Sequence, residues 1–213
     1  MTRAAGGAWF RRDDGAVMAE AALVSPIFLL VVFAVFEFGL AYRDVLTVGD
    51  AVTDAARVGA IQGPDVTPEG ETADYSVVNA VRDGLAGLDP ERIGTIVVFR
   101  AGPATAGSAL SQVPAACKNG PTSTSSHCNT YPPVAAYTAI QSGDVDYFKC
   151  LQPGDPACGW PPTDRIDGPL TSDVEFLGVY VRYQHSYVTG FFGSTFTVER
   201  AAIMRLEPGE LNG

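Results

Sequence analysis

The strongest constraint on the fold of this chain is an apolar stretch close to the N-terminus. Residues 21–36 carry no charge, and beyond Glu37 the chain stays apolar over residues 38–42. A helix needs about 20 apolar residues to span the hydrocarbon core of a bilayer. The sequence therefore predicts one transmembrane helix over residues 16–42, after a short leader over residues 1–15.

Basic residues set the orientation of such a helix, because they are retained on the cytoplasmic side of the membrane. Arg3, Arg11 and Arg12 all precede the apolar stretch. We therefore expect a cytoplasmic N-terminus and a single pass through the cell (inner) membrane. Residues 43–213 would then form an extracytoplasmic domain. The four cysteines all lie in that part of the chain, which suits an oxidising compartment.

The junction between the leader and the apolar stretch has a recognisable pattern. Gly15 follows the basic leader, and Glu20 is the fifth residue after it. This arrangement resembles the cleavage site of type IV prepilins, in which a membrane prepilin peptidase cuts after the glycine. The resemblance implies cleavage between Gly15 and Ala16. Two alternatives stay open: a leader that is never removed, and a secretory signal that is cut before Tyr42.

Glu20 presents a charge-pairing problem at the edge of the membrane. An ionised carboxylate without a partner is costly in hydrocarbon. Cleavage before Ala16 would create an α-amino group that is mostly cationic at neutral pH. If neighbouring helices stack with an axial offset, Glu20 of one subunit can pair with the new N-terminus of another. The alternative is that Glu20 lies solvated among the lipid headgroups.

Two further residues interrupt the apolar helix. Glu37 lies about 25 Å beyond Glu20 along a helix, near the opposite membrane face. We expect it to reach outward to the interface, with a helix–helix contact as the alternative. Pro26 removes one helical hydrogen bond and predicts a kink or a soft point, which could also lie at a helix–helix contact.

Apolar and small residues recur at helical spacing beyond the membrane stretch, so we expect the helix to continue over residues 43–61. Three motifs lie along it: G-x-V-x-x-E-x-A-L-V-x-P at residues 15–26, E-F-G at 37–39, and A-x-x-D-A-A-R at 51–57. Together they resemble the TadE-like family of minor pilins, or pseudopilins, of the tight-adherence secretion system. The resemblance implies a role in assembling Flp-type (type IVb-like) fimbriae for adhesion and secretion. Its implied partners are the prepilin peptidase, other pilins and pseudopilins, the inner-membrane assembly platform and membrane lipid.

The remainder of the chain predicts a small α+β domain. A second helix is expected over residues 72–87, and strands over 93–101, 174–188 and 194–208. These would form a three-stranded antiparallel sheet packed against the two helices. In the second strand Val179 and Tyr180 are expected on opposite faces. In the third, Phe196 is among the residues expected to point inward.

Residues 102–172 form a loop-rich insertion between the first two predicted strands, and the cysteines would tie it down. Four cysteines allow three pairings, of which the local one, Cys117 with Cys128 and Cys150 with Cys158, closes two short loops. A zinc site built from these cysteines and His127 is the alternative. We favour the disulfides, because no close Cys-x-x-Cys pair exists and exported thiols tend to oxidise.

Nothing in the sequence forms a recognisable catalytic constellation. Of the two histidines, His127 lies in a Ser/Thr-rich loop, and His185 is expected to be a packed or half-exposed strand residue. The net charge of −10, without clustered Lys and Arg after residue 43, disfavours a nucleic-acid partner. We therefore expect no catalytic residues, no metal and no cofactor. The competing interpretation is an uncleaved, membrane-anchored exported binding module or anchored enzyme, unrelated to fimbriae.

Overall fold

The computed structural model describes residues 13–102, 113–167 and 175–207. The chain divides into two compact units, an N-terminal unit, Met1–Leu40, and a C-terminal unit, Ala41–Gly213. The first 12 residues of the predicted leader lie outside the described residues.

The first element, α1, runs from Asp13 to Gln62 and contributes to both units. It covers the predicted membrane helix and the predicted continuation over residues 43–61. An 18-residue window within it has a mean hydropathy of 2.4. Among the described residues it is the one helix that is long and apolar enough to cross a membrane.

The C-terminal unit contains a four-stranded antiparallel sheet in the order β2-β1-β3-β4. The strands are β1 (Ile93–Ala101), β2 (Cys128–Tyr131), β3 (Phe176–Ser186) and β4 (Thr195–Arg205). The predicted count of three strands is therefore wrong, because the insertion supplies β2 as an extra edge strand beside β1. Its register places Tyr131 opposite Ile96 and Cys128 opposite Phe99.

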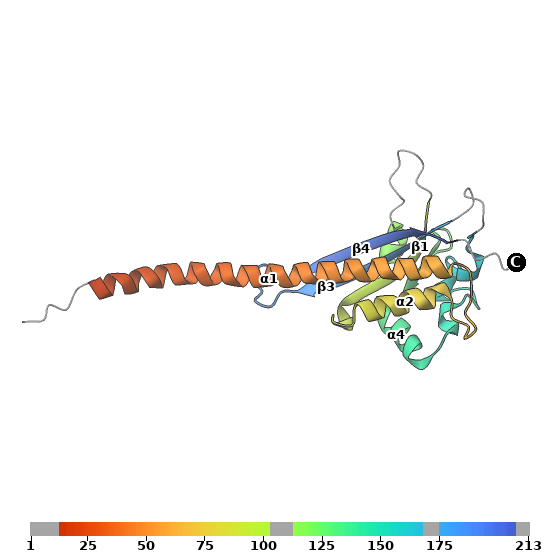
Figure 1. Cartoon of the computed structure of the whole chain (residues 1–213), viewed down its shortest axis with the longest axis horizontal. Coiled ribbons are helices and arrows are strands. Elements are labelled where there is room, and N and C mark those ends of the chain that lie inside the picture. Colours follow the sequence, from red (N-terminus) through yellow and green to blue (C-terminus); the bar gives the residue numbers. More distant parts are fainter. Residues whose placement is uncertain (1–12, 103–112, 168–174, 208–213) are drawn as a thin grey trace, which may run out of the picture. The chain divides into compact units, whose positions relative to one another are not determined.

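Helices cover one face of this sheet. Residues 41–62 of α1 lie beside α2 (Ala73–Gly84), and α4 (Pro133–Ser142) follows β2 (Figure 1). Thr72 caps α2, because its hydroxyl accepts a hydrogen bond from the N–H of Tyr75. The main apolar core lies between these helices and the sheet, and includes Val52, Val77, Val81, Ile96, Val98, Val179 and Val181.

Part of the opposite face of the sheet is also buried, and this was not predicted from the sequence. Tyr180, expected on the face opposite Val179, is 1% exposed. It belongs to a second apolar cluster with Val97, Phe99 and the Cys117–Cys128 disulfide. The insertion supplies this cover through α3 (Ala115–Asn119), so Tyr180 is packed, whereas Gln184 further along the same face of β3 is exposed.

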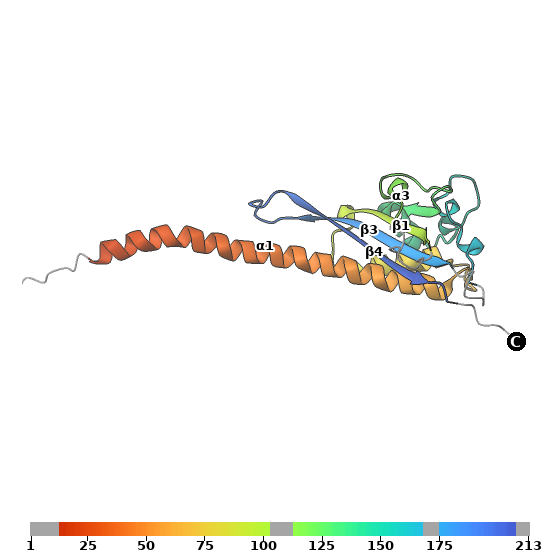
Figure 2. The same cartoon turned by 90° about the horizontal axis from the view of Figure 1, so that it is seen from above.

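The last strand differs from the prediction in another way. Phe196 was expected to point into the core, but it is 45% exposed, whereas Val198 is buried. Both residues lie on β4, an edge strand of the sheet, so the edge position does not distinguish them. Val198 pairs with Tyr183 inside the main apolar core, whereas Phe196 pairs with His185 near the end of β3. Figure 2 shows β3 and β4 continuing beyond the rest of the C-terminal unit as a two-stranded ribbon.

Candidate functional site

The predicted cleavage junction lies in the first turn of α1. The helix begins at Asp13, so the bond between Gly15 and Ala16 is part of that turn. The first four N–H groups of a helix have no intrahelical acceptor. Unwinding this turn so that a peptidase can reach the bond therefore breaks few hydrogen bonds. A Cβ added at Gly15 would meet none of the described atoms within 4 Å. Packing inside the chain therefore does not require a glycine here.

Glu20 lies one turn beyond this junction and is exposed on the helix surface. The sequence has no Lys, Arg or His between Arg12 and Arg43. Cationic side chains pair with an acid on the same helix when they are three or four residues away. No cationic side chain of the same helix therefore stands at pairing distance from Glu20.

The two other predicted residues of the apolar segment are Pro26 and Glu37. Pro26 lies inside α1, which continues on both sides of it. Its ring removes one N–H donor from the helix, leaving a carbonyl one turn earlier without its usual partner. The Glu37 side chain is 2% exposed, in contrast to that of Glu20.

The A-x-x-D-A-A-R motif supplies the small residues at which α1 and α2 approach each other. Ala51, Ala55 and Ala56 are buried. A Cβ added at Gly84 of α2 would lie 2.6 Å from the Cβ of Ala51, too close without a shift of the helices. The motif residues therefore serve the packing of the C-terminal unit.

A buried polar cluster around Asp74 joins α2 to the insertion. The Oδ2 atom of Asp74 accepts hydrogen bonds from Asn129 at 2.7 Å and from the Tyr131 hydroxyl at 2.6 Å. Its Oδ1 atom pairs with Arg165, which lies over the Trp160 ring at 4.3 Å. Asp74 is fully buried and Arg165 is 4% exposed. Because the charges are matched inside the protein, the cluster fixes the insertion in place.

Sequence reasoning missed this cluster, because its members come from three separate segments with no common spacing. Burial raises the pKa of Tyr131 well above its ordinary value, and the neighbouring Asp74 carboxylate raises it further. Tyr131 thus remains a neutral hydrogen-bond donor at physiological pH.

His185 lies at the end of β3 and contacts α1. Its Nδ1 atom is 2.7 Å from Oδ2 of Asp44, and the two residues are 4% and 8% exposed. The sequence predicted a packed or half-exposed strand residue, and the structure has a buried one. This contact places the end of β3 beside the first turn of residues 41–62 of α1.

The cysteines form two disulfides, Cys117–Cys128 and Cys150–Cys158. This is the local pairing, and it leaves no described thiol to bind zinc with His127.

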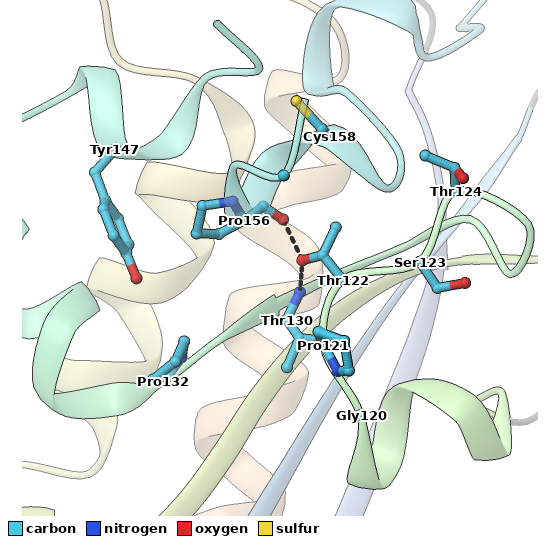
Figure 3. Close-up of a pocket in the computed structure, with 11 residues that line it drawn as sticks. Gly120, Pro121, Thr122, Ser123, Thr124, Thr130, Pro132, Tyr147, Pro156 and Cys158 are labelled. Atoms are coloured by element: carbon cyan, nitrogen blue, oxygen red, sulfur yellow. Dashed lines mark hydrogen bonds between the residues drawn. The ribbon is translucent and has the colours of Figure 1, made fainter. Parts of the chain in front are cut away.

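A pocket of about 680 Å³ opens between the segments that the disulfides hold (Figure 3). The Thr122 hydroxyl stands on its wall, donating to the Pro156 carbonyl at 2.6 Å and accepting from the Thr130 N–H at 2.9 Å. The remaining lining residues are Gly120, Pro121, Ser123, Thr124, Pro132, Tyr147, Gly154 and Cys158.

The lining determines what the pocket can do chemically. It contains hydroxyls, prolines and one aromatic ring, and burial raises the pKa of Tyr147. The described residues that line the pocket include no charged general acid or base, and no group of three His, Cys, Asp or Glu gathers within residues 13–102, 113–167 and 175–207. The chemistry suits contact with an uncharged polar ligand more than acid–base or metal catalysis.

Comparison with known proteins agrees with the N-terminal motifs. Residues 15–57 match the family model described as TadE-like protein, which confirms the resemblance over that part of the chain. The match begins at Gly15 and ends at Arg57, so it contains the junction, Glu20 and the A-x-x-D-A-A-R motif. No curated protein and no solved structure matches the chain.

Proposed function

We propose that this chain, whose residues 15–57 carry the TadE-like signature, is a minor pilin or pseudopilin of a tight-adherence system. It is cut after Gly15 by a prepilin peptidase and takes part in assembling Flp-type fimbriae. The observation that carries the proposal is the match beginning at Gly15, five residues before an acid with no cationic neighbour on its own helix. The role is structural, and the chain performs no catalysis.

The processing step follows from the position of the junction. Gly15 and Ala16 lie in the first turn of α1, and no described neighbour fills the space beside Gly15. A small residue therefore leaves the scissile bond accessible, and the first turn opens at low cost. Cleavage leaves Ala16 as the N-terminus of an apolar helix.

Glu20 then drives the pairing of subunits. In the mature chain the first cationic side chain is Arg43, far from Glu20 along the helix. The new α-amino group is the cation that remains at the same membrane face, and burial of Glu20 against another helix requires such a partner. An amine supplied by a neighbouring, already processed subunit satisfies Glu20 and fixes the axial offset of the two helices.

The C-terminal unit is the part displayed outside the membrane. The three arginines before the apolar stretch favour a cytoplasmic N-terminus. The two disulfides suit an oxidising compartment on the other side. The pocket between the disulfide-tied segments is then available to a partner on the fimbria or on a surface.

N-terminal mass spectrometry of the protein from its native host tests this proposal. A mature chain that begins at Ala16 supports it. A chain that begins at Met1 or Thr2 overturns it in favour of an uncleaved anchored binding module, and a start at Tyr42 identifies a secreted domain. Co-purification with pilins from the same cells is the second measurement, because a processed subunit that never joins an assembly contradicts the role in fimbriae.

A further inference from the structure

The turn between β3 and β4, residues 187–194, carries exposed apolar side chains. We call it the hairpin tip. Phe191 is 68% exposed and Val188 is 78% exposed, and Phe196 at the start of β4 is 45% exposed. Such a concentration of exposed large side chains in one turn marks an interaction site.

The backbone of the tip is shaped to present its aromatic residues. Gly190 and Gly193 flank Phe191 and Phe192, and both have positive φ, 72° and 109°. Side chains other than glycine rarely adopt these angles. The two glycines therefore turn the chain tightly on either side and leave the phenylalanines at the end of the hairpin.

The direction of β3 places the tip at a defined end of the C-terminal unit. Near the start of the strand, Leu177 lies beside Gly59, because a Cβ added at Gly59 would meet its side chain at 3.1 Å. At the other end His185 contacts Asp44. The strand thus runs antiparallel to residues 41–62 of α1, and the tip lies beyond Asp44, toward Ala41. The chain continues from Ala41 into the apolar stretch.

Charge is absent from this end of the hairpin. The chain has a net charge of −10, yet no Asp, Glu, Lys or Arg occurs between Arg182 and Glu199. An acidic surface is repelled by anionic lipid headgroups, so an uncharged segment such as this one can approach a membrane without that repulsion. Aromatic side chains favour the interface between headgroups and hydrocarbon.

We propose that the hairpin tip enters the lipid interface on the extracytoplasmic side, through Phe191 and its neighbours. It would act as a second membrane contact beside the transmembrane helix and limit rotation of the C-terminal unit about that helix. The inference rests on the proposed function only in that the apolar helix is in the membrane and the C-terminal unit is outside. Cleavage after Gly15 is not required for it.

Tryptophan fluorescence of the full chain in phosphatidylcholine vesicles tests the inference. Phe191→Trp places the probe at the tip. Val66→Trp is the matched control, because Val66 is exposed and follows the opposite end of α1. Emission from the native Trp9 and Trp160 is measured in the parent chain and subtracted. We expect the Phe191→Trp emission to be shifted to the blue and quenched several-fold more strongly by brominated phosphatidylcholine than that of Val66→Trp.

Each other result overturns the lipid contact in a distinguishable way. Emission at the tip that is quenched by aqueous acrylamide as strongly as in the control means that the tip lies in water. Emission protected from both quenchers means that a second protein copy covers the tip. Vesicle flotation tests the membrane helix and the tip contact separately. A chain that fails to float contradicts both the membrane helix and the lipid contact of the tip. A chain that floats, but whose Phe191→Trp emission is not quenched by brominated lipid, contradicts only the lipid contact of the tip.

Discussion

Asn129 on β2 donates a hydrogen bond of 2.7 Å to Asp74 on α2, across 55 residues of sequence. The same amide also donates to the Trp160 carbonyl at 2.8 Å, and its oxygen accepts from the Trp160 N–H at 2.7 Å. One buried side chain thus joins the second helix, the added edge strand and the end of the insertion. The insertion is therefore part of the folded C-terminal unit.

The first prediction concerns the carboxylate at the centre of this cluster. Asp74→Ala leaves Arg165 charged, buried and without its ion-pair partner, which costs about 3–5 kcal/mol of the free energy of unfolding. Asp83→Ala on the same helix is the control, because its carboxylate is 61% exposed and pairs with Arg82 at the surface. That loss is at most about 1 kcal/mol. Urea unfolding of the detergent-solubilised chain measures both, and equal losses would contradict the role of the buried pair.

The second prediction concerns alkaline stability. Burial, with the Asp74 carboxylate, raises the pKa of Tyr131, and burial raises the pKa of Tyr137 to about 12. When folding raises the pKa of a tyrosine, the neutral ring contributes its full share to the free energy of unfolding at pH values below the pKa of the unfolded state, about 10. That contribution is lost as the pH rises from there through the folded value.

Unfolding free energies measured at a series of pH values check this alkaline decline. Tyr131→Phe lowers the stability at neutral pH, because a hydrogen bond to a carboxylate is lost, but it makes the decline above about pH 10 less steep. A decline of equal slope in the variant would show that Tyr131 does not control it. Tyr42→Phe changes an exposed ring and serves as the control for the substitution itself.

The sequence predicted those helices and strands whose own residues show a clear local pattern. The residues of β1 were predicted as Ile93–Ala101, and the structure has those bounds, because a run of β-branched residues marks a strand. β2 was missed. It has only four residues, and what stabilises it is distant: pairing with β1, the Asp74 cluster and a disulfide at its first residue.

Burial on the second face of the sheet escaped prediction for the same kind of reason. The alternating pattern along β3 predicted correctly that Val179 and Tyr180 lie on opposite faces, because they belong to the two different apolar clusters. Whether the second face meets water depends on where the insertion folds, and its residues 115–119 are too short for a periodic signal. The TadE-like resemblance was identifiable, because its motifs all lie within residues 15–57 of one continuous helix.

The third prediction compares two glycines in α helices. Gly84→Ala places a methyl group against Ala51 and costs about 1–3 kcal/mol, because well-packed helices must move apart. Gly49→Ala meets no described atom within 4 Å, and it should stabilise the helix by about 0.5–1 kcal/mol. Thermal unfolding of both variants measures the difference. Two changes of the same sign would contradict close packing of α1 on α2.

The fourth prediction separates the two disulfides. Their cysteines are 11 and 8 residues apart, so loop closure contributes similarly to both, about 2–3 kcal/mol. Cys117 and Cys128 are fully buried in the second apolar cluster, whereas Cys150 is exposed. Replacing the first pair by alanine therefore costs more, because a cavity is added to the lost cross-link. Equal unfolding free energies for the two double variants would contradict this order.

The last prediction concerns Glu20 and the leader. Gly15→Leu should block cleavage, because a large side chain occupies the space that the junction leaves open, and the leader should remain in the intact mass. Glu20→Ala should still be cleaved but should not co-purify with pilins, because its helix no longer offers an anion to a neighbouring α-amine.

Glu20→Gln keeps the size and the hydrogen-bonding capacity without the charge. If Glu20→Gln assembles at the level of the parent chain while Glu20→Ala does not, hydrogen bonding and not charge holds the subunits together. If both assemble normally, Glu20 has no part in pairing.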